Sequence, residues 1–173
     1  IQLKELFDED GRANTDSVDI FNLIDDSISE IQIPPEVSMA TKFTGPQDFR
    51  VDSEKMKIAI QNLVNNALDG VLAGGVLHIS CDTSVESLIL EVKNTGNRLS
   101  EDQIQQLLNE GSIETDFGNH SIAISQKIVE EHGGSILVNS ESGHGTSYTM
   151  ILPRDYRNEI QSNNLEYIHQ KTI

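Results

Sequence analysis

The stretch from Ser125 to Pro153, SQKIVEEHGGSILVNSESGHGTSYTMILP, constrains the fold of this chain more than any other. Its first part has helical spacing of apolar residues, and Gly133-Gly134 follows as a stop signal for a helix. Two strands are predicted next, at residues 135–138 and 147–152, around the hairpin turn Gly143-His144-Gly145. A second informative segment runs from Gln61 to Gly70, where asparagines recur at helical spacing.

The remaining apolar patterns predict alternating helices and strands. Helical spacing favours helices at residues 20–31, 54–72 and 101–108, the first capped by Asp19 and the second by Asp52 or Ser53. Alternation favours strands at residues 37–44, 49–51, 76–81 and 88–92. Because several neighbouring strands are joined by tight turns, we expect an α/β fold. We predict a two-layer sandwich with a mixed, mostly antiparallel sheet and helices on one face.

Composition narrows the possible partners. The 173 residues carry a net charge of -16, and such an acidic chain repels phosphate backbones and anionic membranes, so we expect no nucleic-acid partner. No apolar run approaches the ~20 residues needed to span a bilayer. Cys81 is the only cysteine and lies in an apolar strand, so we interpret it as a small core residue in a reducing, cytoplasmic compartment.

The long helix at residues 54–72 carries a polar face. Asn62 and Asn66 are four residues apart, Asp69 follows three residues later, and Asn65 is turned away by about a hundred degrees. Two amides and a carboxylate on one face suit oxygen ligation of Mg²⁺ together with phosphate oxygens. A solvent-exposed polar face is the alternative.

Two loops add candidates for ligand contact. Asn94 and Gly96 follow a strand, where an amide can bond a ligand edge and a glycine lets a flat ring approach the backbone. An ordinary Asn-Gly turn is the alternative. Asn119, His120 and Ser121 lead into a helix N-terminus, whose free N–H groups can receive phosphate, although an unliganded cap is more frequent.

Taken together, QNLVNNAL, VKNTG, IVEEHGG and SGHGTSYTMILP occur in an order and spacing that resemble the ATP-binding domain of sensor histidine kinases. That family shares its Bergerat-type nucleotide fold with DNA gyrase, heat-shock protein 90 and mismatch-repair ATPases. The resemblance covers roughly Val18 to Pro153. It implies the end of a dimerisation helix and a linker at residues 1–16, an ATP-binding catalytic domain at 17–153 and a C-terminal tail at 154–173.

The resemblance also implies roles for individual residues. Asn66 corresponds to the Mg²⁺-coordinating asparagine of the family. Asn62 stands where related ATPases keep a catalytic glutamate, and an amide there is no strong general base. Asn94 takes the place of an aspartate that binds the adenine amino group, and an Asn oxygen can still accept from that amine. Thr146 matches a threonine that helps to hold adenine.

Other positions depart from the family pattern. Asp69 replaces a basic or aromatic residue, and Arg98 replaces the second glycine of the motif that begins at Asn94. Asn119 and Ser121 stand where a lid motif has two glycines. The segment 109–118 is short and carries acids at positions 110, 114 and 116, which is unfavourable for a loop over phosphates unless Mg²⁺ or Arg98 compensates.

The resulting hypothesis is a catalytic domain that binds ATP and Mg²⁺ and passes the γ-phosphate to a histidine outside residues 1–173. Its expected partners are the dimerisation and phosphoacceptor domain of the same protein and a response regulator, in a homodimeric full-length protein. Two alternatives stay open. One is a regulatory module of the same fold with weak or no nucleotide binding, and the other is an anti-sigma-factor serine kinase.

Overall fold

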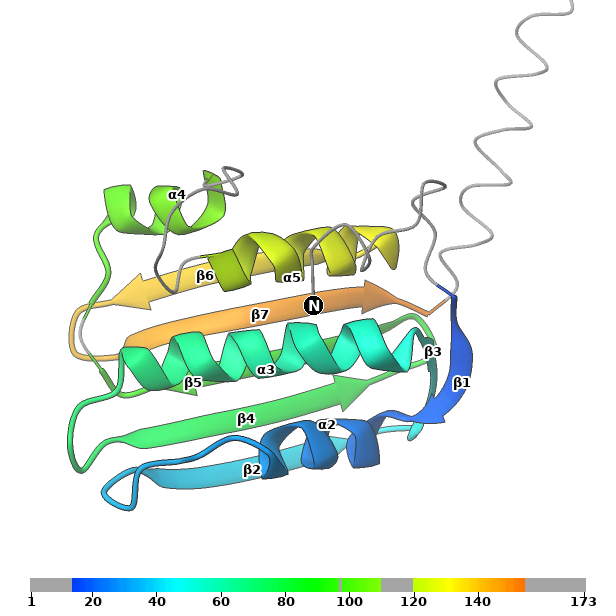
Figure 1. Ribbon diagram of the computed structural model, residues 1–173, viewed down its shortest axis with the longest axis horizontal. Coiled ribbons are helices and arrows are strands. Elements are labelled where there is room, and N and C mark those ends of the chain that lie inside the picture. Colours follow the sequence, from blue (N-terminus) through cyan, green and yellow to red (C-terminus); the bar gives the residue numbers. More distant parts are fainter. Residues whose placement is uncertain (1–13, 97, 110–119, 155–173) are drawn as a thin grey trace, which may run out of the picture.

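The computed structural model describes residues 14–96, 98–109 and 120–154, with no description of the side chains of 109, 120 and 121. Its main sheet has five strands in the order β2-β4-β5-β7-β6 (Figure 1). β2 and β4 pair in parallel, whereas the other pairs are antiparallel. The strands are β2 Ser38–Thr44, β4 Val76–Thr83, β5 Ser87–Asn94, β6 Ser135–Glu141 and β7 Gly145–Pro153.

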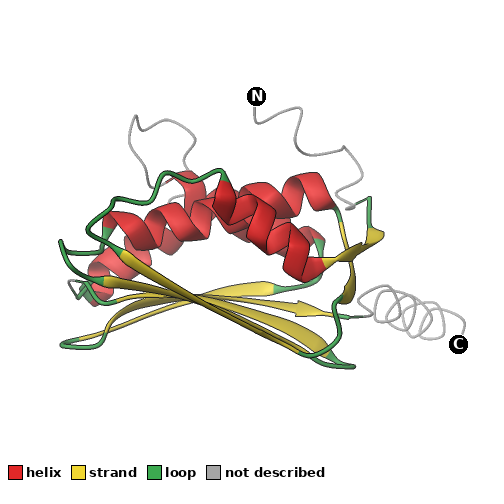
Figure 2. Cartoon of the chain, turned by 90° about the horizontal axis from the view of Figure 1, so that it is seen from below, coloured by secondary structure: helices red, strands yellow, loops and turns green. Residues whose placement is uncertain are grey.

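Helices cover one face of this sheet and leave the other face open (Figure 2). They are α2 Ile20–Ser29, α3 Ser53–Asp69 and α5 His120–Glu131, whereas α4 Glu101–Asn109 contacts α5 beyond the β6 edge of the sheet (Figure 1). Every second strand residue faces the helices, as Leu77, Ile79 and Cys81 do in β4, and these side chains are at most 1% exposed. The two-layer α/β sandwich predicted from the sequence is therefore confirmed.

The end of the sheet near the N-terminus of α3 carries a separate two-stranded ribbon. β1 (Asp16–Asp19) pairs antiparallel with β3 (Asp48–Val51). The sequence predicted a strand at β3, but β1 was expected to be linker and the start of the domain. Phe49 and Val51 of β3 are buried, so the ribbon closes that end of the core.

Helix α3 begins and ends at residues with capping interactions. Asp52 is the N-cap, and its side chain accepts a hydrogen bond from Lys55 N. The helix ends at Asp69 with Gly70 as C-cap. The prediction that it continues to residue 72 was wrong. Val71, which extends the apolar stripe, instead forms an isolated β-bridge with Gly96.

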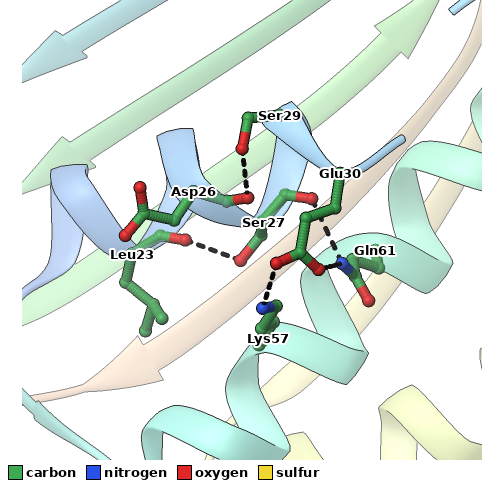
Figure 3. A network of polar contacts seen from close by, with 7 residues as sticks. All are labelled: Leu23, Asp26, Ser27, Ser29, Glu30, Lys57 and Gln61. Atoms are coloured by element: carbon green, nitrogen blue, oxygen red, sulfur yellow. Dashed lines mark hydrogen bonds and ion pairs between the residues drawn. The ribbon is translucent and has the colours of Figure 1, made fainter. Parts of the chain in front are cut away.

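Polar contacts fix α2 against α3 (Figure 3). Glu30 follows α2, and its two carboxylate oxygens accept from Lys57 Nζ at 2.6 Å and Gln61 Nε2 at 3.0 Å. The hydrogen bond from Lys57 is the main reason that the pKa of Glu30 is lowered. Gln61 also donates to the carbonyl of Ser27 at 3.3 Å. Gln61 directly precedes Asn62, so this network lies next to the polar face of α3.

Candidate functional site

The polar face of α3 brings Asn62 and Asn66 into contact. Asn66 is 9% exposed, and its Nδ2 donates to the carbonyl of Asn62 at 2.8 Å. This bond directs the nitrogen toward the helix backbone, so the amide oxygen is the end of the side chain that can ligate a cation. Asn62 is half-buried, whereas Asn65 and Asp69 are exposed.

The residues that end β5 and begin β7 meet the last turn of α3. We call Gly70, Asn94, Gly96 and Thr146 the Asn94 junction. Asn94 is fully buried, and its Nδ2 donates to the carbonyl of Ala67 at 2.6 Å. Its Oδ1 accepts from Gly96 N at 3.2 Å and from Thr146 N at 3.0 Å. Asn94 and Gly96 therefore meet Thr146, which follows 52 residues after Asn94, and Asn94 also contacts Ala67, the residue directly after the candidate Asn66.

The backbone is tightly packed at this junction. A Cβ atom on Gly96 would lie 1.7 Å from the carbonyl oxygen of Gly70, and one on Gly145 would lie 1.8 Å from that of Asn94. Glycine is required at both positions because another part of the chain approaches its backbone closely. On the side of Gly96 where a Cβ would stand, the neighbouring group is the Gly70 carbonyl.

Thr146 is 2% exposed and has a second polar partner that the sequence did not reveal. Its Oγ1 is 2.8 Å from the hydroxyl of Ser140, which also accepts from Leu99 N at 2.9 Å. Ser140 thereby connects the β6–β7 hairpin to the segment before α4. No motif marked Ser140, and only its register opposite Thr146 could have indicated it.

Tyr148 is a further residue that the sequence analysis missed. It is 4% exposed on the helix-facing side of β7, two residues after Thr146. Burial, and secondarily the charge of Asp69, raises the pKa of Tyr148 to about 12. A neutral phenol therefore lies near Asp69, and the period of two along β7 could have placed it beside Thr146.

The opposite end of α3 is joined to the end of α5. His132 is 2% exposed, and its Nε2 accepts from Asp52 N at 3.0 Å while Nδ1 lies 2.7 Å from the carbonyl of Ile128. Lys55 Nζ and Glu131 Oε2 form an ion pair at 2.9 Å. Burial of the ring lowers the pKa of His132, despite the nearby Ile128 carbonyl and the charges of Asp52 and Glu131.

Several residues expected at the site belong to the loop before α5 or to the start of that helix. Asn119, the side chains of His120 and Ser121, and the acids at 110, 114 and 116 lie outside the described residues. Arg98 is exposed and lines a hollow at the start of α4 with Ser100 and Glu101. Within residues 14–96, 98–109 and 120–154, no group of three or more His, Cys, Asp and Glu could hold a metal. A cation at α3 would therefore depend mainly on amide, water and ligand oxygens.

Comparison with known proteins identifies the class to which this fold and this cluster belong. Residues 51–156 match the family described as histidine kinase-, DNA gyrase B-, and HSP90-like ATPase. The chain belongs to this family and is an ATPase domain of the histidine kinase type.

Individual relatives agree with this assignment. Sensor protein SrrB of Staphylococcus aureus (strain NCTC 8325 / PS 47) is 30% identical over 128 residues, which make up 68% of this chain and 21% of that protein. The chain thus spans about a fifth of that relative.

Solved structures show the same fold. The catalytic domain of the histidine kinase ThkA superposes with a TM-score of 0.69 at 18% identity, covering 82% of this chain and 98% of that one. The mycobacterial sensor histidine kinase MprB has a TM-score of 0.69 at 19% identity and covers 80% of this chain and 96% of its own. Full-length ShkA in complex with AMPPNP also gives 0.69 at 19% identity, covering 82% of this chain and 31% of ShkA.

None of the described helices is long and apolar enough to cross a membrane.

Proposed function

We propose that this domain binds Mg-ATP beside the polar face of α3 and the Asn94 junction, and transfers the γ-phosphate to a histidine outside residues 1–173. The observation that carries the proposal is the orientation of Asn66, whose amide nitrogen is held by the Asn62 carbonyl. An oxygen held in this way can ligate Mg²⁺ together with water and phosphate oxygens, while Asp69 adds a carboxylate one turn later.

The described side chains suit phosphoryl transfer better than direct hydrolysis. Such transfer is catalysed mainly by positioning and charge neutralisation. Asn62, on the same face as Asn66, has no carboxylate with which to activate water. Backbone N–H groups at the start of α5, near Asn119, His120 and Ser121, are the proposed phosphate donors.

The acceptor histidine is proposed to lie outside the chain because the described histidine side chains are in unsuitable settings. His78 lies in a strand, His132 is buried, and His144 is exposed at the tip of a β-hairpin. The proposed partners are therefore a dimerisation and phosphoacceptor domain in a homodimeric sensor kinase and a response regulator. The proposed location is cytoplasmic. That SrrB is named a sensor protein supports this context.

Calorimetric titration of ATP and ADP, with and without Mg²⁺, tests the proposal. We expect Mg²⁺-dependent micromolar binding, which corresponds to about -8 kcal/mol. Asn66→Ala should abolish the Mg²⁺ dependence, whereas the exposed neighbour Asn65→Ala, as matched control, should retain it. Absence of binding at millimolar ATP would reject the kinase function and favour a regulatory module of the same fold. Unchanged Mg²⁺ linkage in Asn66→Ala would reject the metal role.

A further inference from the structure

Asn94 has its polar atoms committed to the protein itself. Its oxygen accepts from two backbone N–H groups, those of Gly96 and Thr146, and its nitrogen donates to the Ala67 carbonyl at 2.6 Å. These partners also fix which end of the amide is which. A flipped amide would set its NH₂ group against two N–H donors and its oxygen against a carbonyl.

The side-chain oxygen of Asn94 is therefore not available to accept a hydrogen bond from the amino group of a ligand. A carbonyl oxygen has two lone pairs, and both are engaged. Asn94 is also 0% exposed, and a Cβ on Gly70 would lie only 2.7 Å from its Nδ2. Protein backbone encloses the amide on several sides, so a base that reached the oxygen would have to displace an existing hydrogen bond.

From this geometry we infer that Asn94 is a structural residue that ties α3, β5 and β7 together, and that the nucleotide site does not select purines by their 6-amino group. The statement about the 6-amino group rests on the proposed function, whereas the structural role of Asn94 does not. The ligand class is then a purine nucleoside triphosphate with either an amino or an oxo group at position 6.

The same contacts make aspartate unsuitable at this position. A carboxylate could keep the two bonds from Gly96 N and Thr146 N with one oxygen. Its other oxygen would face the Ala67 carbonyl at the present 2.6 Å, so two acceptors and a buried charge would meet. Asn94→Asp is therefore expected to damage the junction instead of improving adenine binding.

Two measurements test the inference. The first compares ATP with inosine triphosphate, which carries an oxo group where ATP has the 6-amino group, by calorimetry on the unmodified chain with Mg²⁺. A site that hydrogen-bonds a substrate N–H rejects an analogue lacking it by roughly 10⁴-fold. Without such a contact we expect the two dissociation constants to agree within about threefold. ATP binding that is a hundredfold tighter or more would overturn the inference while leaving the proposed function intact.

The second measurement is thermal unfolding of Asn94→Asp, with Asn139→Asp as control. Asn139 is exposed on the open face of the sheet, so the control makes the same chemical change without disturbing the junction. We expect the midpoint to fall by about 5 °C or more in Asn94→Asp and to change little in the control. An unchanged midpoint in Asn94→Asp would overturn the structural role. If neither triphosphate binds, the proposed function is rejected, and so is the inference about the 6-amino group. The unfolding measurement still tests the structural role of Asn94.

Discussion

His132 connects the end of α5 to the start of α3, and replacing it tests how much stability that connection contributes. Its ring accepts from Asp52 N at 3.0 Å and lies 2.7 Å from the Ile128 carbonyl, to which Nδ1–H can donate. Asp52 is itself the N-cap of α3. His132→Ala removes both bonds and leaves a cavity where the buried ring was. The backbone N–H of Asp52 loses its acceptor.

The size of the effect follows from these contacts. Two hydrogen bonds contribute about 1 kcal/mol each, and burial of the ring adds roughly 1 kcal/mol. We therefore expect His132→Ala to lower the free energy of unfolding by about 3 kcal/mol, which corresponds to about 6–12 °C in midpoint for a domain of this size. Urea and thermal unfolding at pH 7.5 measure both quantities.

The pH dependence gives a second signature of the same residue. Lys55, Asp52 and Glu131 are the charged groups around the ring, and burial outweighs the acids, so the pKa of His132 in the folded state is lowered from 6.5. Below about pH 6.5 the unfolded chain therefore binds more protons than the folded one. The stability from His132 is fully present above pH 6.5 and decreases as the pH falls. Between pH 7.5 and 5.5 the loss is at most about 1.4 kcal/mol.

His132→Ala should lack this contribution, so the difference in stability between wild type and variant should narrow at pH 5.5. His144→Ala is the control, because His144 lies exposed at the β6–β7 turn. It should retain both the stability and the pH dependence of the wild type. A loss below about 1 kcal/mol in His132→Ala at pH 7.5, or a difference that stays constant with pH, would refute the reasoning.

Two further sets of substitutions test other contacts of the domain. Removing one member of the Lys55–Glu131 ion pair, whose side chains are 12% and 7% exposed, should cost about 3 kcal/mol, and Lys55→Met with Glu131→Leu should cost much less. Equal losses in the single and double variants, in urea unfolding, would contradict this. Gly145→Ala should lower the free energy of unfolding by several kcal/mol more than Gly143→Ala. Both glycines have φ of +78°, but only at Gly145 would the Cβ meet backbone, 1.8 Å from the carbonyl oxygen of Asn94. Similar midpoints for the two variants would show that the junction can relax.

The architecture could be predicted because its elements have strong local signals. Apolar alternation identified β4 and β5, and helical spacing with an aspartate cap identified α2. Long-range pairing has no such signal. β3 follows β2 along the chain but pairs with β1, whose four residues show no marked alternation. The end of α3 was misplaced for a similar reason, since the stripe continues to Val71 and only the β-bridge to Gly96 shows why the helix has stopped.

The candidate site also combines features that the sequence can reveal with contacts that only the structure shows. Its glycines could be recognised in sequence because a close backbone approach excludes every other residue, and Gly96 and Gly145 meet that condition. The role of Asn94 could not be deduced in this way, since an amide can either accept from a ligand or bond the chain around it. Three internal hydrogen bonds favour the second use. The motif therefore predicts where the side chain of Asn94 lies in the fold. The hydrogen-bond partners at that place determine what the side chain does. For this reason Asn94→Asp, which resembles the family more closely, is expected to fold less stably.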